Sequence, residues 1–428
     1  MSNPKTDSLR FNPILTLALV LLLLSYGNAQ TQVESRLTST AFDIRYSDKG
    51  ITDLRRVDDV HNTNYIAAGS TLGPLILRYR CVGDGEWQEV SEIMSGAEQT
   101  DSRITYTVAT LQPSLAEKRP IKDLKVDLTF SLQDQALDWT ITLINESGKI
   151  LEIGDLGVPM RLAERTPRNR SNIYTQKLLR HSYVAGYGSW IFWHRANVVG
   201  PFLVMTTGDS TKLEYFDNSG RVFTPYIHAT LTGAEPMTRA RAFGRSQPWR
   251  LPLTRLRLAP KGQEGSRVRY SFKFQFAPDF DGVRGVLYEE GLFDTHVLPG
   301  MALPVDLPAM ISLHTQIDIE AIESEYPEDT RITYLGERGT DNHIYQVRFQ
   351  KLGKTCSRSG TATNSGCRWN SLSWNHWKPS FRNGLVFSYP TCSTVIPRNT
   401  GTGPTAIGIK LTRSCVILRI ATACAPGS

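Results

Sequence analysis

Alternation of apolar and polar residues is the feature that most restricts how this chain can fold. It is clearest between residues 124 and 143, where Leu, Val, Phe, Trp and Ile occupy every second position on either side of Gln133-Asp134-Gln135. This pattern predicts an antiparallel hairpin with one buried face. Similar patterns recur at residues 104–108, 251–258 and 268–276, and no segment between residues 30 and 280 keeps a helical period. Because one-faced strands need a second sheet to cover them, we expect a mainly β chain.

A second, smaller β region is expected after residue 295. A short helix is predicted at residues 282–290, with Asp281 as its N-cap and Gly291 as its stop. The segment HVLPGMALPVDLP contains three prolines and is interpreted as a linker. Strand-like alternation then resumes between Ile311 and Phe349. We therefore expect a β domain at residues 30–295 and a partial small β-sandwich at residues 296–353.

Acidic residues stop abruptly near the end of this second region. All 41 Asp and Glu residues precede residue 342, whereas residues 351–428 hold five of the six cysteines and ten of the 48 Lys and Arg residues. Residues 1–350 are therefore close to neutral, with 38 basic and 41 acidic groups. The net positive charge of the whole chain therefore comes from the residues after 350 and does not describe residues 1–350.

Three interpretations of the tail from residue 354 compete. A nucleic-acid-binding arm needs clustered Lys and Arg, but these residues are scattered here, so no nucleic-acid partner is expected. A disulfide module is open only if distant Cys81 supplies the sixth cysteine. The third interpretation is a shifted reading frame. In this frame, each codon takes the last base of one tail codon and the first two bases of the next. The genetic code then permits the sequence MLAVRYGNEQWMPLEFFVMEPLE from Thr355 and YWAYSDWDQTDKELRNPEDRDGLRTW from Thr400. Because both strings carry acids and have an ordinary composition, we expect residues 354–428 to be a frameshifted, disordered tail.

The N-terminus indicates export. Lys5 and Arg10 precede an apolar run from Ile14 to Leu24, and small residues at Gly27 to Ala29 fit a cleavage site. The run is shorter than the roughly 20 residues of a comfortable membrane span, although an uncleaved anchor is the alternative. We expect residues 1–29 to be a signal peptide, the protein to be periplasmic or extracellular, and no membrane span to persist after cleavage.

Four segments carry a resemblance to a known family: RHSYVAGYGSWIFWHRANVVGPFLVMT, KLEYF, FDGVRGVLYEEGLFDTHVLPGM and TYLGERG. Across most of residues 40–350 the chain resembles an uncharacterised family of large secreted microbial proteins that carry a domain of unknown function. The resemblance implies a galactose-mutarotase-like supersandwich, then an immunoglobulin-like β domain, incomplete here, and then a glycosidase-like (α/α) toroid. The shifted-frame strings resemble the continuation toward that toroid, so the resemblance implies a chain truncated before it.

An aromatic cluster is the strongest candidate for a sugar surface. Aromatic faces can stack on sugar rings while His and Arg donate to hydroxyl groups. The candidate carbohydrate-binding residues are Tyr187, Trp190, Trp193, His194 and Arg195, to which we add Glu214, a single acid in a strand-like segment. Alternation places Trp190, Phe192 and His194 on one face of a strand and Ile191, Trp193 and Arg195 on the other, so at least one set is expected to be core. Tyr187 is expected at a loop tip.

No catalytic residue, cofactor or metal site is predicted. The eight His residues are dispersed without HxH or HExxH spacing, and no GxSxG elbow or P-loop is present. Asp279 and Asp281 fit helix capping better than glycoside cleavage. We expect an exported, carbohydrate-associated, catalytically silent N-terminal part of a glycosidase-like protein, whose partner is an oligosaccharide or polysaccharide. The alternative is a stand-alone sugar-binding or cell-envelope protein with a genuine tail.

Overall fold

The computed structural model describes residues 35–83, 86–91, 95–108, 110–114, 117–120, 123–184, 188–208, 211–218, 222–231, 255–299, 302–303, 306–319, 321–324, 327–350, 354–355, 357–358, 360–361, 371–373 and 418–422. The signal peptide predicted at residues 1–29 and most of the tail predicted at residues 354–428 lie outside these ranges. Within them, no helix has the length and apolar character needed to cross a membrane.

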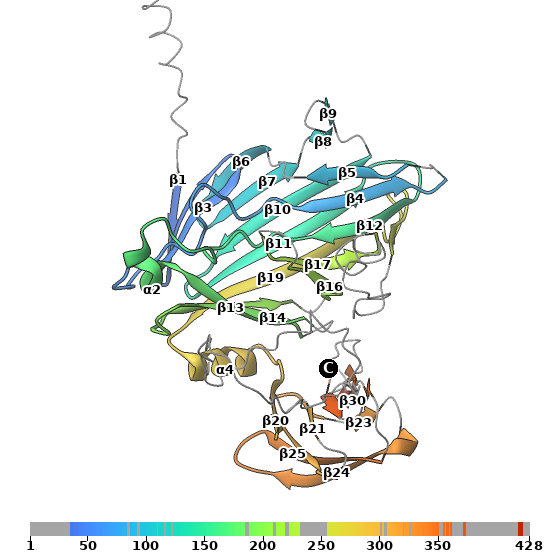
Figure 1. Ribbon diagram of the computed structural model, residues 1–428. Helices are drawn as coiled ribbons and strands as arrows, with labels where there is room; N and C mark the ends of the chain where they lie inside the picture. Colours follow the sequence, from blue (N-terminus) through green and yellow to red (C-terminus); the bar gives the residue numbers. More distant parts are fainter. Residues whose placement is uncertain are drawn as a thin grey trace, which may run out of the picture. The chain divides into compact units, whose positions relative to one another are not determined.

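The largest sheet in the described part of the chain has eight strands in the order β13-β14-β15-β19-β11-β10-β7-β6 (Figure 1). Its strands are β6 (Ser95–Thr100), β7 (Arg103–Val108), β10 (Leu124–Leu132), β11 (Ala136–Asn145), β13 (Leu178–Tyr183), β14 (Trp190–Arg195), β15 (Phe202–Thr207) and β19 (Arg267–Ala277). The predicted hairpin is confirmed as β10 and β11, which pair from Leu124 with Asn145 to Leu132 with Leu137. Alternate residues of β10 are buried, as its period requires.

A six-stranded sheet shares the main core with the eight-stranded sheet. It contains β4 (Ile76–Cys81), β5 (Gln88–Ser91), β12 (Leu151–Gly157), β16 (Tyr215–Asp217), β17 (Thr224–Ala229) and β18 (Leu256–Leu258). Ile153 and Leu156 of β12 belong to the same buried cluster as Phe130, Trp139 and other residues of the larger sheet. The chain is therefore mainly β and built of stacked sheets, which confirms the predicted fold class.

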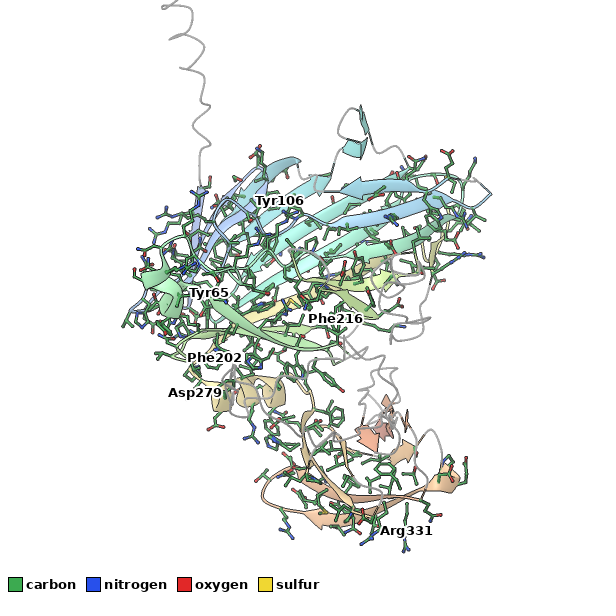
Figure 2. The ribbon with its side chains drawn as sticks, in the orientation of Figure 1. Tyr65, Tyr106, Phe202, Phe216, Asp279 and Arg331 are labelled. Carbon is green, nitrogen blue, oxygen red and sulfur yellow. The ribbon has the colours of Figure 1, made fainter. Side chains whose placement is uncertain are left out.

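Short strands complete the region before residue 280. Three of them form a separate sheet: β1 (Ser35–Thr38), β2 (Phe42–Ser47) and β3 (Gly50–Arg56). Another two, β8 (Thr110–Ser114) and β9 (Glu117–Pro120), pair only with each other among the described strands. The 3-10 helix η1 (Arg170–Asn172) and the one-turn helix α2 (Ile173–Gln176) precede β13. Tyr65 and Tyr106, labelled in Figure 2, are buried in the main core.

The predicted helix is present as α4 (Phe280–Glu289), two residues earlier than expected. Its N-cap is Asp279, whose carboxylate accepts a hydrogen bond from the backbone N–H of Gly282 at 2.8 Å. Asp281 lies in the first turn, so the prediction that it caps the helix is wrong. Gly291 follows the helix with a φ of +65°, a conformation that glycine adopts without steric cost. Phe202 and Val283 share the buried cluster beneath α4.

The small β region contains a four-stranded antiparallel sheet in the order β20-β22-β25-β24. Its strands are β20 (Asp294–Leu298), β22 (Ala309–His314), β24 (Thr330–Glu337) and β25 (Asn342–Phe349). The linker interpretation is wrong for residues 296–298, because β20 pairs with β22 up to Leu298 and Met310 and ends only where Pro299 follows. It is also wrong for Ala302–Leu303, which form a short strand, β21. Ile317 and Ile319 lie outside any strand, contrary to the alternation pattern.

The remaining described elements are short. They are β21 (Ala302–Leu303), β23 (Ala321–Ser324), η2 (Pro327–Asp329), β26 (Lys354–Thr355), β27 (Ser357–Arg358), β28 (Gly360–Thr361), β29 (Ser371–Ser373) and β30 (Leu418–Thr422). β23 pairs with β27 and β30. Because most tail residues lie outside the described ranges, the frameshift and disorder of residues 354–428 stay predictions.

Candidate functional site

Strand β14 carries four of the six predicted sugar-contact residues and has two buried faces. Ile191 and Trp193 point into the main core, whereas Phe192 belongs to the cluster beneath α4. The predicted alternation is therefore confirmed. The sequence required only one set to be core, yet both sets are covered, because one face of β14 packs in the main core and residues of α4 cover the other.

Arg195 is held in a fully buried ion pair. Its Nη1 atom lies 2.5 Å from Oδ1 of Asp59, and both side chains have 0% exposure. The same guanidinium donates to the hydroxyl of Thr63 and to the carbonyl oxygens of Val199 and Gly200. A buried charge is tolerated only when it is paired and hydrogen-bonded in this way. These contacts tie the turn after β3 to the end of β14, so the role that the geometry gives Arg195 is structural.

His194, which is buried, forms an imidazole pair with the half-buried His181. The two Nε2 atoms are 2.9 Å apart, and Nδ1 of His194 lies 2.7 Å from the carbonyl oxygen of Arg195. That carbonyl can only accept, so Nδ1 of His194 carries the proton and its Nε2 accepts from His181. Burial lowers the pKa of His194 below its usual 6.5, which favours this neutral form.

Trp190 packs against two hydrophobic clusters that are separate from the main core. Its ring stacks on Tyr183 with centroids 5.6 Å apart and on Phe192 with centroids 5.8 Å apart. It is half-buried and packs against both the cluster beneath α4 and the core of the four-stranded sheet. Part of its surface is accessible, although its ring faces are engaged by neighbouring rings. Tyr187, the residue predicted at a loop tip, lies outside the described residues.

Trp193 is fully buried, but its indole N–H connects it to a polar group near the surface. Nε1 of Trp193 donates to Oε1 of Glu164 at 2.9 Å. The other carboxylate oxygen of Glu164 accepts from Nη1 of Arg180, and Nη2 of Arg180 donates to Oδ1 of Asn218 at 3.2 Å. Glu164 and Arg180 keep 27% and 13% of their side-chain surface, and Asn218 is exposed. We call Glu164, Arg180 and Asn218 the Glu164 group.

Aromatic rings flank the Glu164 group. The guanidinium carbon of Arg180 lies 3.7 Å from the ring centroid of Phe223. The Phe223 ring packs in turn on Phe216, which is half-buried and labelled in Figure 2. A carboxylate, a guanidinium and an amide beside an aromatic surface are the groups that orient hydroxyl-rich ligands. None of these residues was predicted from the sequence, because they come from separate segments and no local motif connects them.

Glu214 is fully buried and lies next to a series of polar side chains. Its Oε1 atom lies 3.4 Å from Nζ of Lys212 and 3.9 Å from Nδ1 of His228. Nε2 of His228 lies 2.6 Å from the hydroxyl of Tyr270 on β19. A carboxylate, an imidazole and a phenol therefore follow one another inside the sandwich. Glu214 itself has 0% side-chain exposure, whereas Lys212 and His228 keep 28% and 10% of theirs.

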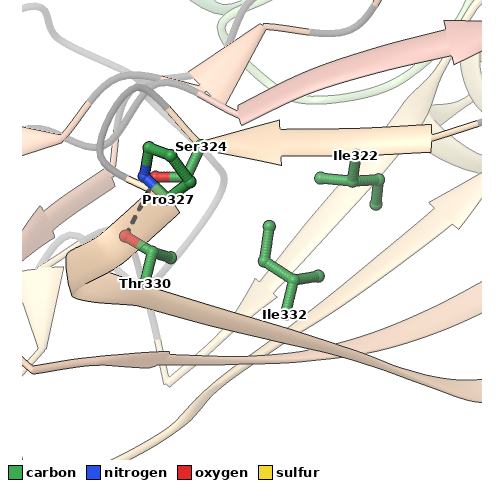
Figure 3. Close-up of a pocket in the computed structure, with 5 residues that line it drawn as sticks. All are labelled: Ile322, Ser324, Pro327, Thr330 and Ile332. Atoms are coloured by element: carbon green, nitrogen blue, oxygen red, sulfur yellow. Dashed lines mark hydrogen bonds between the residues drawn. The ribbon is translucent and has the colours of Figure 1, made fainter.

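The small β region contains an open pocket of about 430 Å³, lined by Ile322, Ser324, Pro327, Thr330 and Ile332 (Figure 3). Its two hydroxyl groups are hydrogen-bonded to each other at 2.9 Å. No ionisable side chain belongs to this lining. Elsewhere in the described part of the chain, no group of three or more His, Cys, Asp or Glu side chains is placed to hold a metal ion.

Comparison with known proteins places the sequence in a family. Residues 31–358 match a family described as "Family of unknown function (DUF5695)". The match begins just after the predicted signal peptide and ends within the acid-free tail. Among curated proteins, no sequence matches this chain.

Solved structures show what the fold is similar to. A polysaccharide lyase matches 79% of this chain with a TM-score of 0.55 and 12% identity, and the chain spans 47% of that lyase. A galactose mutarotase related enzyme from Lactobacillus acidophilus matches 58% of this chain and 99% of its own, with 10% identity and a TM-score of 0.32. An α-galactosidase from Geobacillus stearothermophilus matches 63% of this chain and 45% of its own, with 8% identity and a TM-score of 0.32. At these identities, the likeness to the lyase concerns the fold alone.

Proposed function

This chain belongs to the DUF5695 family, and we propose that it is an exported protein that binds oligosaccharide or polysaccharide at the Glu164 group. The observation that carries the proposal is the bonded chain from Trp193 through Glu164 and Arg180 to Asn218. The likeness in fold to a polysaccharide lyase supports a role in carbohydrate processing. The signal-like residues 1–29 support export.

The Glu164 group has the properties of a preorganised sugar contact. Trp193 fixes one oxygen of the Glu164 carboxylate from inside the core, so the side chain cannot swing freely. Arg180 is held by Glu164, by Asn218 and by the face of Phe223. Side chains fixed in this way lose little conformational freedom when a ligand binds. Acceptors on Glu164 and donors on Arg180 and Asn218 complement adjacent sugar hydroxyls.

The expected affinity is modest. Stacking on one aromatic ring contributes about 0.5–1.5 kcal/mol beyond its buried area. A site that combines Phe216 with a few polar contacts should therefore bind an oligosaccharide with a Kd near the millimolar range. Tyr187 and the accessible part of Trp190 are retained as proposed further contacts. No turnover of a glycan is expected from the full chain.

Titration calorimetry after a glycan-array screen tests this proposal. Glu164→Gln should weaken binding of the selected oligosaccharide about tenfold, since hydrogen bonds to charged groups contribute about 1.5–3 kcal/mol. The variant keeps an oxygen that can accept from Trp193, so the contact to the core is preserved, whereas its amide nitrogen cannot accept from Arg180. Glu146→Gln is the matched control, because Glu146 forms a surface ion pair with Lys261. Equal affinities for Glu164→Gln and the wild type would exclude the Glu164 group as the site.

A further inference from the structure

A second polar surface lies on the six-stranded sheet. Glu152 of β12 is 2% exposed and faces Arg80 of β4, its cross-strand partner. One oxygen of Glu152 accepts from both Nε and Nη2 of Arg80, at 2.9 and 2.8 Å. The other oxygen lies 3.3 Å from Nη1 of Arg255. Burial alone would raise the pKa of Glu152, but the two arginines outweigh it and lower the pKa.

The two guanidiniums exceed this carboxylate by one positive charge. Each guanidinium has five N–H donors, and Glu152 receives bonds from two nitrogens of Arg80 and one of Arg255. Arg255 is 51% exposed and Arg80 is 25% exposed, so both side chains reach solvent. The nearby acids Asp155 and Glu89 both pair with Arg78. Arg257, which is exposed, lies opposite Glu152 on β18 and adds a further positive charge.

An aromatic ring is built into the same surface. The guanidinium of Arg80 lies 4.4 Å from the ring centroid of Trp87, which is half-buried. The indole also packs against the backbone at Gly154. A Cβ atom at this position would lie 2.8 Å from a ring carbon of Trp87. Only glycine therefore leaves room for the indole in this position. Stacking on the ring holds the Arg80 fork in a fixed plane.

We infer that Arg80, Arg255 and Trp87 form a binding site for the anionic group of an acidic glycan, a carboxylate or a sulfate ester. A planar guanidinium pair matches the geometry of either anion, and the buried Glu152 keeps both arginines oriented without neutralising them. Trp87 offers an apolar edge to the sugar that carries the anion. The inference goes beyond the proposed function, since it names the chemical class of glycan and a surface separate from the Glu164 group.

The experiment titrates the full chain with trigalacturonate, a sulfated trisaccharide and neutral maltotriose at low salt. We expect at least one anionic trisaccharide to bind, and Arg255→Gln to weaken it about tenfold through loss of a charge-assisted contact. Arg255→Lys should recover part of the affinity, because it keeps the charge but not the fork. A preference for the carboxylate or for the sulfate identifies which anion the site takes.

Arg331→Gln is the matched control, because Arg331 is an exposed arginine on β24 in the small β region (Figure 2). It also accounts for non-specific attraction to the basic tail, which both variants retain. Equal binding of anionic trisaccharides by Arg255→Gln and Arg331→Gln, or no anionic binding at all, would overturn the inference. The effect of Glu164→Gln on maltotriose binding tests the proposed function alone. If maltotriose binding does not change in this variant, the trigalacturonate result still stands.

Discussion

At the scale of single residues, charges inside the sandwich are the most sensitive points. Replacing Asp59 with Asn removes the only ionic partner that the described residues give Arg195 and leaves a guanidinium uncompensated at 0% exposure. We expect a loss of about 3–5 kcal/mol in the free energy of unfolding at pH 7. Urea unfolding of the full chain measures it. A loss below about 1 kcal/mol would show that the other acceptors of Arg195 are sufficient.

In the wild type, acid should reduce the stabilisation that the Asp59–Arg195 ion pair gives to the fold. Burial by itself raises the pKa of Asp59, but the hydrogen bonds from Arg195, Thr63 and His61 lower it below its usual 3.8. A carboxylate with a depressed pKa stabilises the fold above its unfolded pKa, and this stabilisation is lost as the pH falls through the folded pKa. The stability difference between wild type and Asp59→Asn should therefore shrink below pH 3.8.

The His181–His194 pair predicts a second, separate pH dependence. Because burial lowers the pKa of His194, the unfolded chain binds a proton near pH 6.5 that the folded chain does not. Stability should therefore be unaffected by His194 above pH 6.5 and should decrease as the pH falls below it. His194→Asn keeps a donor for the carbonyl oxygen of Arg195 and should flatten the slope between pH 6.5 and 5. An unchanged slope would mean that folding does not lower the pKa of His194.

At the scale of elements, α4 should depend on its cap. Asp279→Ala removes the acceptor for the Gly282 N–H and should cost about 1 kcal/mol of stability, whereas Asp279→Asn should cost less. Asp281→Ala is the internal comparison, because its carboxylate lies in the first turn and, among the described residues, forms only an exposed pair with Arg284. Thermal unfolding compares the three variants. A larger loss for Asp281→Ala than for Asp279→Ala would contradict the assignment of the cap.

Elements with a clear alternation of apolar and polar residues could be predicted from the sequence. Elements that form through pairing with another strand could not. The β10–β11 hairpin follows from alternate burial of its residues. β20 was missed because prolines around residues 299–308 mask a strand that exists through pairing with β22. The faces of β14 were predicted correctly, but the partners that bury its polar atoms were not. Glu164 and Asp59 are 29 and 136 residues away from the side chains they bind.

At the scale of the whole molecule, the acid-free tail predicts a property of the gene. With one base restored near codon 354, the reading frame is expected to continue past the present tail through the two acid-bearing strings. The reason is compositional: residues 342–428 contain no Asp or Glu, although residues 1–341 contain all 41. Sequencing the locus tests this directly. Codons incompatible with those strings, or an early stop in that frame, would show that the tail is genuine.

Sugar binding by the full chain at the Glu164 group can be located directly. Hydrogen exchange of the protein with and without a saturating oligosaccharide locates the contact without any substitution. We predict slower exchange at Glu164, along Arg180 and its neighbours in β13, and at residues 216–218, with no change on β24. Protection elsewhere in the chain while these segments exchange unchanged would show that the sugar does not bind at the Glu164 group.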